Sequence, residues 1–408
     1  MNTLRCATML IAALLCGAAA LSGCGSSDPA GTASTTSAAL ESLPAGSVMA
    51  STSCTLTAAG IPIPANHCWR LSYRTTDTSG AAVETIATVL VPDGAPASGR
   101  VLVSYQTAED GLTTACAPST EFSKGTSLEE ANVVLDLAQG WVVVAPDYEG
   151  PQSQYGAGIM AGQAVLDGIR AAENFAAAGL DGAATKVGME GYSGGALATG
   201  WAMELQGSYA PELTLVAVAE GGVPADIGAV AKNVDGGLFS GIELAAAIGI
   251  KRAYQYRFDF ESYLNTAGKA MEQNIGDMCL GSPGNAPDPL TAYPYKKLDQ
   301  YTTIPDFLGY APVQAILDEL KMGQRKPVAA SLFMFNSIVD ELIPIATVDA
   351  LHATYCSEGV NVTYERTLAG EHIVALVPFF LQALPYLQGA FSGKPVVNPL
   401  AASCGASG

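Results

Sequence analysis

Short, nearly uninterrupted apolar runs that alternate with stretches of helical periodicity are the feature that most restricts how this chain can fold. Residues 141–145 (WVVVA) and 213–219 (LTLVAVA) are two such runs, and residues 159–178 between them place apolar side chains at helical spacing. A strand is apolar at successive positions where both of its faces are buried, as in a parallel sheet covered by helices. The alternation therefore predicts an α/β fold with a mostly parallel sheet flanked by helices.

The same alternation runs through most of the chain and is interrupted once. Further strands are expected at residues 84–91, 100–105, 186–190, 331–338 and 361–366, and further helices at 128–139, 197–205 and 373–388. Residues 225–325 contain helices and loops but no clear apolar strand run. Because the strand pattern resumes after them, we interpret this segment as a mainly helical cap inserted into the sheet domain.

The sequence GYSGG at residues 191–195 matches the pattern G-x-S-x-G, which alone is a weak signal in a glycine-rich chain. Here it follows a predicted strand and precedes a predicted helix, which is the setting of a nucleophile elbow. Such a turn forces the serine into an unfavourable backbone conformation, and Gly191 and Gly195 lack the Cβ atoms that would clash. The pattern favours Ser193 as a nucleophile. The alternative, a phosphate-binding loop, is poor because no lysine follows in the required register.

A serine hydroxyl needs a base that accepts its proton, and the chain contains three histidines. His67 lies near the N-terminus, before the predicted sheet begins, and His352 lies within a segment of helical spacing. His372 follows the strand predicted at residues 361–366 and precedes a helix. We therefore expect His372 to be the base, with His67 as a distant alternative.

The base in turn needs a carboxylate that fixes its tautomer and stabilises its protonated form. Asp340 follows the strand predicted at residues 331–338, Glu341 is the main alternative, and Asp349 falls within a helix. The chain order Ser193, Asp340, His372 is that of the α/β hydrolases. It therefore predicts an α/β-hydrolase fold with these three residues as the catalytic triad.

An oxyanion hole needs two backbone N–H groups aimed at the developing negative charge. Gly194, the residue after the predicted nucleophile, is expected to supply one of them. The second is expected from the loop after the strand at 100–105, residues 106–111 (QTAEDG). The composition of this loop does not select the donor.

The N-terminus has the features of an export signal. Residues 1–23 contain Arg5 and then an apolar run that is too short for a mature membrane span. The sequence LSGC at 21–24 resembles a bacterial lipoprotein box, in which Cys24 would be lipidated. Residues 24–47 are rich in Ser, Thr, Ala and Gly and are expected to form a flexible tether, and residues 48–408 the catalytic domain. We expect an exported bacterial protein, either secreted or held in the cell envelope as a lipoprotein.

Cysteine usage agrees with export. Apart from the leader and anchor, the chain has six cysteines: Cys54, Cys68, Cys116, Cys279, Cys356 and Cys404. An even number in an exported protein predicts three disulfides, for which 15 pairings exist. Cys54 with Cys68 is the most local pair. No CxxC motif or nearby histidine pair indicates a metal site, and no cofactor is expected.

The charge balance restricts the class of partner. Lys and Arg number 19 against 38 Asp and Glu, which gives a formal net charge of -19. Such a chain repels nucleic-acid backbones and anionic membrane faces, so a nucleic-acid partner is not expected. A neutral ester substrate is indifferent to this charge.

Several longer stretches resemble the secretory lipases of the Candida lipase A type. The resemblance rests on six segments: residues 71–80 (LSYRTTDTSG), 104–119 (SYQTAEDGLTTACAPS), 164–175 (AVLDGIRAAENF), 190–213 (EGYSGGALATGWAMELQGSYAPEL), 339–344 (VDELIP) and 370–373 (GEHI). It extends from Leu71 to Cys404, nearly the whole mature chain. The block around Ser193 is far longer than the bare pentapeptide.

The resemblance implies an α/β-hydrolase core with a helical cap and a triad of Ser193, Asp340 and His372. It assigns the oxyanion donors to the backbone N–H groups of Asp110 and Gly194. It also implies disulfides Cys116–Cys279 and Cys356–Cys404, which leaves Cys54–Cys68 as the additional pair. The expected substrates are acylglycerols or other acyl esters, with a lipid–water interface as a site of action.

Two other functions are compatible with these residues. The same triad serves acyltransferases, amidases and peptidases, in which the acceptor or the scissile bond differs. An anchored protein of this fold could instead be a binding module, which predicts a broken triad, whereas all three members are present here. Apolar residues at 239–250 are expected to line an acyl site, although packing of the cap on the core would explain them equally well.

Overall fold

The computed structural model describes residues 37–58, 61–63, 66–96, 98–281, 288–327, 330–394 and 401–404. The strands of its central sheet are β1 (Val48–Cys54), β4 (Asn66–Thr76), β5 (Ala82–Pro92), β6 (Leu102–Gln106), β7 (Val142–Pro146), β8 (Lys186–Tyr192), β9 (Thr214–Gly221), β10 (Ser331–Ser337), β11 (Val362–Thr367) and β12 (Ala402–Cys404). They are arranged in the order β1-β4-β5-β7-β6-β8-β9-β10-β11-β12. Neighbours from β7 to β11 pair in parallel. The predicted mostly parallel sheet is therefore confirmed.

Antiparallel strands extend this sheet at both edges. β1, β4 and β5 pair antiparallel with one another and onto β7, and β12 pairs antiparallel with β11. The sequence interpretation placed His67 before the sheet, which is wrong, because His67 lies in β4 opposite Val91 of β5. The strand was missed because β4 mixes polar with apolar residues, as a strand that is not buried on both faces does. A separate small sheet joins β2 (Thr57–Ala58) to β3 (Ile61–Pro62).

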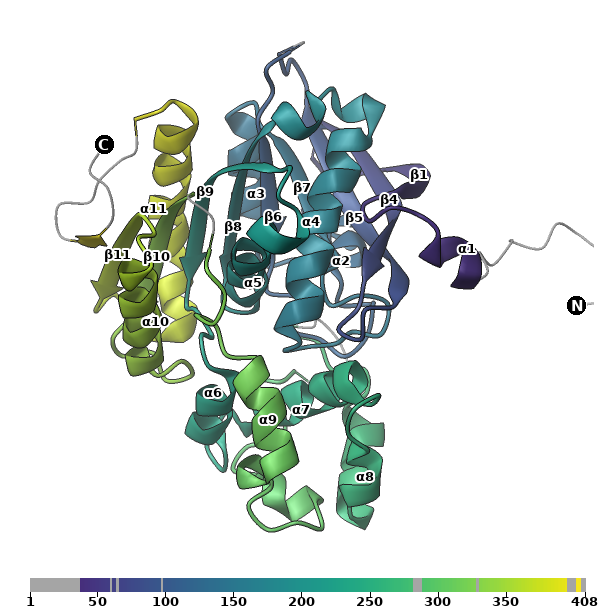
Figure 1. The fold of residues 1–408 in the computed structure, drawn as a ribbon, viewed down its shortest axis with the longest axis vertical. Helices are drawn as coiled ribbons and strands as arrows, with labels where there is room; N and C mark the ends of the chain where they lie inside the picture. Colours follow the sequence, from purple (N-terminus) through teal and green to yellow (C-terminus); the bar gives the residue numbers. More distant parts are fainter. Residues whose placement is uncertain are drawn as a thin grey trace, which may run out of the picture. The chain divides into compact units, whose positions relative to one another are not determined.

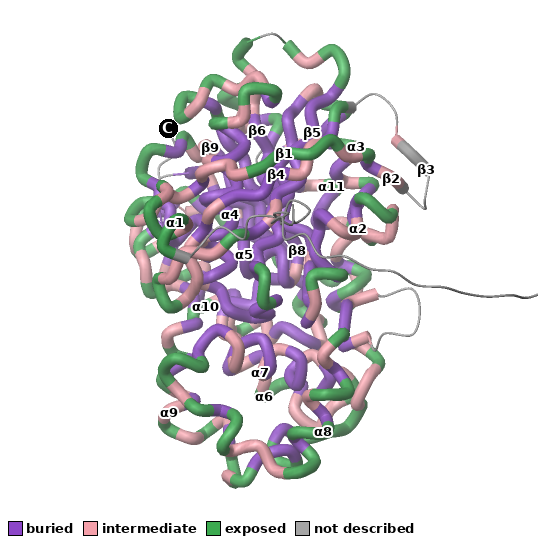
Figure 2. The backbone as a smooth tube through the Cα atoms, turned by 90° about the vertical axis from the view of Figure 1, so that its right-hand side faces the viewer, coloured by how far each residue is buried: buried purple, intermediate pink, exposed green. Residues whose placement is uncertain are grey.

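Helices cover both faces of the central sheet. α4 (Gly158–Asn174), α5 (Gly194–Tyr209) and α10 (Ile345–Ser357) contribute to one apolar core, and α2 (Pro118–Lys124), α3 (Glu130–Ala138) and α11 (His372–Phe391) contribute to the other. β7 shows the division, because Val142 and Val144 lie in the first core and Val143 and Ala145 in the second. This period of two follows from the pleat of a strand. Figure 2 shows the buried backbone concentrated along this sheet.

The cap consists of the segment between β9 and β10. Its helices are α6 (Ile227–Val234), α7 (Ser240–Tyr254), α8 (Thr266–Ile275) and α9 (Ala311–Glu319). Figure 1 shows them grouped at one end of the sheet, away from the helices that cover its faces. The helical segment expected at residues 225–325 thus forms a layer over one end of the strands.

The last part of the predicted tether, residues 37–47, is packed on the domain. Residues 37–47 were assigned to it, but they begin with α1 (Ser37–Glu41) and then pack on the domain. The Gly46 N–H donates to the Arg74 carbonyl at 2.9 Å, and Gly46, with φ of 78°, lies against the Arg170 side chain. A flexible composition does not prevent packing where a glycine fits a close approach. The leader 1–23, Cys24 and the tether up to residue 36 lie outside the described residues.

Three disulfides join the cysteine pairs named above, Cys54–Cys68, Cys116–Cys279 and Cys356–Cys404. Among the described helices, α11 alone has the length and apolar character of a membrane span, with a mean hydropathy of 1.5. It packs on β8, β9 and β10 through residues such as Phe379, Ala383 and Leu387, which are fully buried. Its apolar character is therefore explained by its place in the core.

Candidate active site

The turn from β8 into α5 holds Ser193 in the conformation of a nucleophile elbow. Ser193 has φ of 55° and ψ of −119°, outside the regions that residues with a Cβ atom favour. A backbone of this kind costs on the order of 1–3 kcal/mol and persists only where its surroundings enforce it. The Ser193 N–H donates to the Gly221 carbonyl of β9 at 2.9 Å, and its carbonyl accepts from Leu197 of α5 at 2.9 Å. Strand and helix together therefore fix the strained serine.

Two glycines make this turn sterically feasible. A Cβ atom on Gly191 would lie 2.4 Å from the Gly195 carbonyl oxygen, and one on Gly195 would lie 2.0 Å from that of Gln106. Real Cβ atoms do not approach backbone this closely, so the turn excludes every larger residue at both positions. The second contact also joins the elbow directly to the end of β6.

The imidazole of His372 connects Ser193 to Asp340. His372 Nε2 lies 2.7 Å from Ser193 Oγ, and His372 Nδ1 lies 2.7 Å from Asp340 Oδ2. Because the ionised carboxylate can only accept, Nδ1 carries the proton and Nε2 is left to accept from the serine hydroxyl. The His372 side chain is 2% exposed and that of Asp340 0%. These residues come from three separate segments that follow β8, β10 and β11, as the sequence predicted.

The carboxylate and the histidine are themselves held by neighbouring groups. Asp340 Oδ1 accepts from the Leu342 and Ile343 N–H groups at 3.0 and 2.7 Å. The Tyr192 hydroxyl donates to the His372 carbonyl at 2.6 Å. Tyr192 occupies the variable position of the motif directly before Ser193, where the pattern itself predicts no role for the side chain.

The alternative residues named from the sequence lie elsewhere. Glu341 accepts from the His372 backbone N–H at 2.9 Å and is not the partner of the imidazole ring. Asp349 accepts from the Tyr364 hydroxyl. His67 Nε2 lies 3.3 Å from Asp93 Oδ1, and the His67 side chain is 65% exposed. His352 packs on the Tyr364 ring and lies 3.2 Å from Cys356 Sγ.

The loop between β6 and α2, residues 107–117, reaches the elbow from the other side, and we call it the oxyanion loop. Asp110 in this loop has φ of 32° and is buried. A Cβ atom on Gly194 would lie 1.9 Å from Asp110 Oδ1, so the two residues predicted as oxyanion donors are direct neighbours. Gly194 begins α5, and its N–H is one of the first four of the helix, which have no acceptor within it.

Buried side chains support the first half of the oxyanion loop. The Ala108 N–H donates to Glu129 at 2.7 Å, and the Glu109 N–H donates to the Tyr148 hydroxyl at 3.0 Å. The Tyr148 hydroxyl in turn donates to the Thr107 carbonyl at 2.7 Å. Neither Glu129 nor Tyr148 was singled out from the sequence, because their partners are separated from them by tens of residues.

Buried carboxyl groups gather behind this loop, and burial raises their pKa values. The pKa of Asp110 is raised to about 6 by burial, although the nearby His372 lowers it. Burial raises the pKa of Glu129 to about 7, against hydrogen bonds from Ala108 and Tyr105. Burial also raises the pKa values of Glu109 and Glu149 well above the usual range, with repulsion from Glu149 added at Glu109 and repulsion from Asp110 added at Glu149. These carboxyl groups therefore keep their protons to a higher pH than they would in water.

A cavity of about 230 Å³ lies between the elbow and the cap. Ser193, Gly194, His372 and Asp110 are among the residues that line it. The remaining wall is mainly apolar, with Ile242, Ala246 and Ile250 of α7, Leu317 of α9 and Phe307 among its residues. The segment expected to line an acyl site therefore borders the cavity through α7. A reactive hydroxyl in the wall of a mainly apolar cavity suits a substrate with a polar reacting group and an apolar chain.

The family model described as Secretory lipase matches residues 118–399 of this chain. A "Secreted triacylglycerol lipase LIP5" of Malassezia furfur is 32% identical over 327 residues, which cover 76% of this chain and 83% of that protein. A protein of Mycobacterium tuberculosis named "Probable inactive lipase MT1628" is 32% identical over 341 residues, 81% of this chain and 74% of that protein.

A solved structure is similar over most of the chain. The X-ray structure of Candida antarctica lipase A superposes with a TM-score of 0.80 at 30% sequence identity. The match covers 89% of this chain and 86% of that one. Sheet, cap and elbow thus belong to an architecture that a lipase of known structure shares.

Proposed function

This chain belongs to the secretory lipase family, and from that premise we propose that it is a triacylglycerol lipase that uses Ser193, His372 and Asp340 as its triad. That it is a secreted lipase or esterase follows from the family and from lipase relatives over most of its length. The observation that supports the proposed triad is the pair of 2.7 Å contacts that run from Asp340 through His372 to Ser193. Hydrogen bonds of this length are the arrangement that activates a serine nucleophile.

In the proposed first half-reaction, Ser193 Oγ attacks the acyl carbonyl carbon while His372 Nε2 accepts the hydroxyl proton. The carbonyl oxygen becomes an oxyanion and accepts from the N–H groups of Gly194 and Asp110. Losing one such donor costs roughly 3–4 kcal/mol of barrier. The C–O bond to the leaving alcohol then breaks, and His372 passes its proton to the alcohol oxygen.

In the second half-reaction, water attacks the acyl-enzyme. His372 accepts a proton from the water, the oxyanion forms again at the same two N–H groups, and the fatty acid leaves as the proton returns to Ser193 Oγ. Asp340 stays ionised throughout and stabilises the imidazolium. Every proton transfer in the proposed reaction therefore uses Nε2 of the His372 ring.

The preference for acylglycerols is supported by the cavity and its mouth. Its apolar wall suits a fatty acyl chain, whose burial contributes about 0.8 kcal/mol for each CH₂ group. Leu128 and Ile373 line the cavity and are nevertheless 73% and 47% exposed. Exposed apolar side chains beside the reactive serine would favour contact with a lipid–water interface.

We also propose that the exported protein is held at a membrane through a lipid on Cys24. The support is the LSGC sequence after the apolar leader. A lipidated protein partitions into the detergent phase in a Triton X-114 separation, whereas Cys24→Ser should remain in the aqueous phase. Equal partitioning of the two proteins would contradict the anchor.

The hydrolysis profile over p-nitrophenyl esters from acetate to palmitate, with an anilide of the same acyl group, tests the proposed function. We expect turnover of esters with medium or long chains, far slower turnover of the anilide, and no turnover by Ser193→Ala. Faster turnover of the anilide than of the ester would contradict a lipase. An inactive protein despite correct folding would place it with the relative named as inactive.

A further inference from the structure

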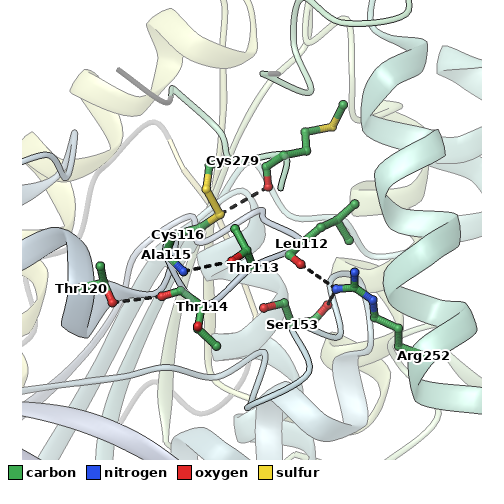
Figure 3. The surroundings of a disulfide bond; sticks show 10 residues. Leu112, Thr113, Thr114, Ala115, Cys116, Thr120, Ser153, Arg252 and Cys279 are labelled. Carbon is green, nitrogen blue, oxygen red and sulfur yellow. Dashed lines mark hydrogen bonds between the residues drawn. A yellow bond between two sulfur atoms is a disulfide. The ribbon is translucent and has the colours of Figure 1, made fainter. Parts of the chain in front are cut away.

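Arg252 lies on the face of α7 that packs on the core. One turn earlier on the same face, a Cβ atom on Gly249 would lie 2.2 Å from the Tyr155 carbonyl oxygen, so the helix backbone touches the loop after β7 directly. This contact brings Arg252 between that loop and the oxyanion loop. Figure 3 shows its side chain reaching from α7 toward Leu112 and Ser153.

One nitrogen of this side chain holds three backbone carbonyls. Arg252 Nη1 donates to Leu112 at 2.7 Å, to Gln152 at 3.0 Å and to Ser153 at 3.2 Å. None of these carbonyls belongs to the cap. Burial lowers the pKa of Arg252 while Glu272 and Glu149 raise it, but guanidinium stays protonated in proteins, so the hydrogen bonds are charge-assisted.

Both loops that Arg252 contacts contain a strained backbone. Asp110 has φ of 32° and Ser153 has φ of 46°. The Leu112 carbonyl lies two residues after Asp110, and the Ser153 carbonyl belongs to a strained residue itself. Such conformations persist only where surrounding contacts over-determine them. Arg252 supplies a contact of this kind to each loop.

A second connection joins the same part of the oxyanion loop to the cap. The Leu112 N–H donates to the Met278 carbonyl at 2.9 Å, and the Leu280 N–H donates to the Asp110 carbonyl at 3.2 Å. The disulfide Cys116–Cys279 closes the same region. Two independent sets of contacts with the cap therefore hold the segment that carries the Asp110 N–H: the hydrogen bonds of Arg252, and those of residues 278–280 with the disulfide.

We propose that Arg252 is a positioning residue for ester hydrolysis, because it fastens the oxyanion loop to the cap and so fixes the Asp110 N–H opposite that of Gly194. The inference rests on the proposed function. Arg252 does not line the cavity, whereas its neighbours Ile250 and Lys251 do. Its loss should therefore change the stabilisation of the oxyanion, which forms only in the transition state, and leave substrate binding unchanged.

The test compares Arg252→Met with Arg257→Met in the full-length protein. Met keeps much of the apolar length of the arginine and removes its hydrogen bonds. Arg257 is a matched control because it lies just after the end of α7 and its contacts stay within the cap. It pairs with Glu319 and lies over the Tyr254 ring. Values of kcat and KM for p-nitrophenyl octanoate are measured with the Ki of an alkyl trifluoromethyl ketone, which forms a tetrahedral oxyanion adduct on the serine.

For Arg252→Met we expect kcat to fall about 10- to 100-fold, less than the 100- to 1,000-fold that follows removal of an oxyanion donor. KM should change little, and the Ki of the ketone should rise with the loss in kcat. Arg252→Lys should recover most of the activity, because all three contacts come from one nitrogen with two N–H donors, and an ammonium at the same place offers three. Arg257→Met should keep the wild-type kcat and Ki.

Equal kcat and Ki for folded Arg252→Met and wild type would overturn the positioning role while leaving the proposed function intact. A wild-type protein without esterase activity would overturn both. If Arg252→Met does not fold, Arg252→Gln replaces it and the same two outcomes apply. In a Cys116→Ser/Cys279→Ser background the loss in kcat should become larger, because only the backbone hydrogen bonds to Met278 and Leu280 then join the loop to the cap.

Discussion

The two halves of the candidate site are built in different ways. The elbow takes its conformation from a short motif, in which Gly191 and Gly195 make room for one strained serine beside β6 and β9. The oxyanion loop depends on distant partners, namely Cys279 and Arg252 of the cap and Tyr148 beyond β7. The elbow is therefore visible in five letters of sequence, whereas the geometry of the loop emerges only when the cap has folded onto the sheet.

The largest expected effect concerns the carboxylate that orients the base. Asp340→Asn should lower kcat by roughly 10⁴-fold, because an amide at this position stabilises the wrong tautomer of His372. Glu341→Gln, which alters a contact to the His372 backbone only, should lower kcat by less than about 10-fold. Steady-state hydrolysis of one ester by both variants decides between the two neighbouring residues. A larger loss for Glu341→Gln would contradict the assignment.

The close fit of the elbow against the end of β6 can be tested by adding one methyl group. Gly195→Ala places a Cβ atom against the Gln106 carbonyl and should lower the free energy of unfolding by about 1–3 kcal/mol, as overpacking does. Activity should fall with it, because β6 or α5 must shift. Gly276→Ala is the control, since its Cβ atom would have no neighbour closer than 3.6 Å. Thermal unfolding in which the two variants behave alike would refute the steric argument.

The dependence of the oxyanion loop on the cap can be tested by removing one disulfide at a time. Cys116→Ser/Cys279→Ser should lower both Tm and kcat, because it releases the loop. We expect kcat to fall about 10-fold, which is less than the 100-fold or more that follows removal of an oxyanion donor. Cys54→Ser/Cys68→Ser, at the edge of the sheet, should lower Tm by a smaller amount and leave kcat unchanged. A disulfide that closes a longer loop stabilises more. The expected contribution is about 5 kcal/mol for a loop as long as that of Cys116–Cys279 and about 3 kcal/mol for one as short as that of Cys54–Cys68.

Unchanged kcat in the Cys116→Ser/Cys279→Ser variant, measured on folded protein, would show that the cap does not position the loop. A loss of kcat in Cys54→Ser/Cys68→Ser would show that activity follows global stability alone. The comparison needs a temperature well below both Tm values, so that each assay contains folded enzyme.

The smallest effect is on the pH dependence of stability. Burial raises the pKa values of Asp110 and Glu129 to about 6 and 7, so the folded state keeps protons that the unfolded state loses near pH 4. Stability should therefore fall as the pH rises through this range, and Tm should be higher near pH 5 than near pH 8. Glu129→Gln should flatten the decline in differential scanning fluorimetry. A Tm that rises from pH 5 to pH 8 would contradict the raised pKa values.

The sequence predicted those parts of the molecule that local patterns determine. The buried parallel strands, the elbow and the segments that carry Asp340 and His372 all follow from apolar runs and the turns behind them. β4 was missed because an antiparallel strand that is not buried on both faces lacks such a run, and residues 37–47 because packing on Arg170 overrides their flexible composition. The residues of the loop did not select Asp110 as a donor, since its φ of 32° is set by contacts far away in sequence. Only the family resemblance named it.

The most direct test of the account is the site at which a fluorophosphonate modifies the folded protein. The contacts from Asp340 through His372 to Ser193 predict one phosphonyl group for each chain, located by peptide mass mapping on the segment that contains Ser193, and none on Ser193→Ala. Folded wild-type protein that stays unmodified, or that is labelled as strongly as Ser193→Ala, would contradict the assignment of an activated serine.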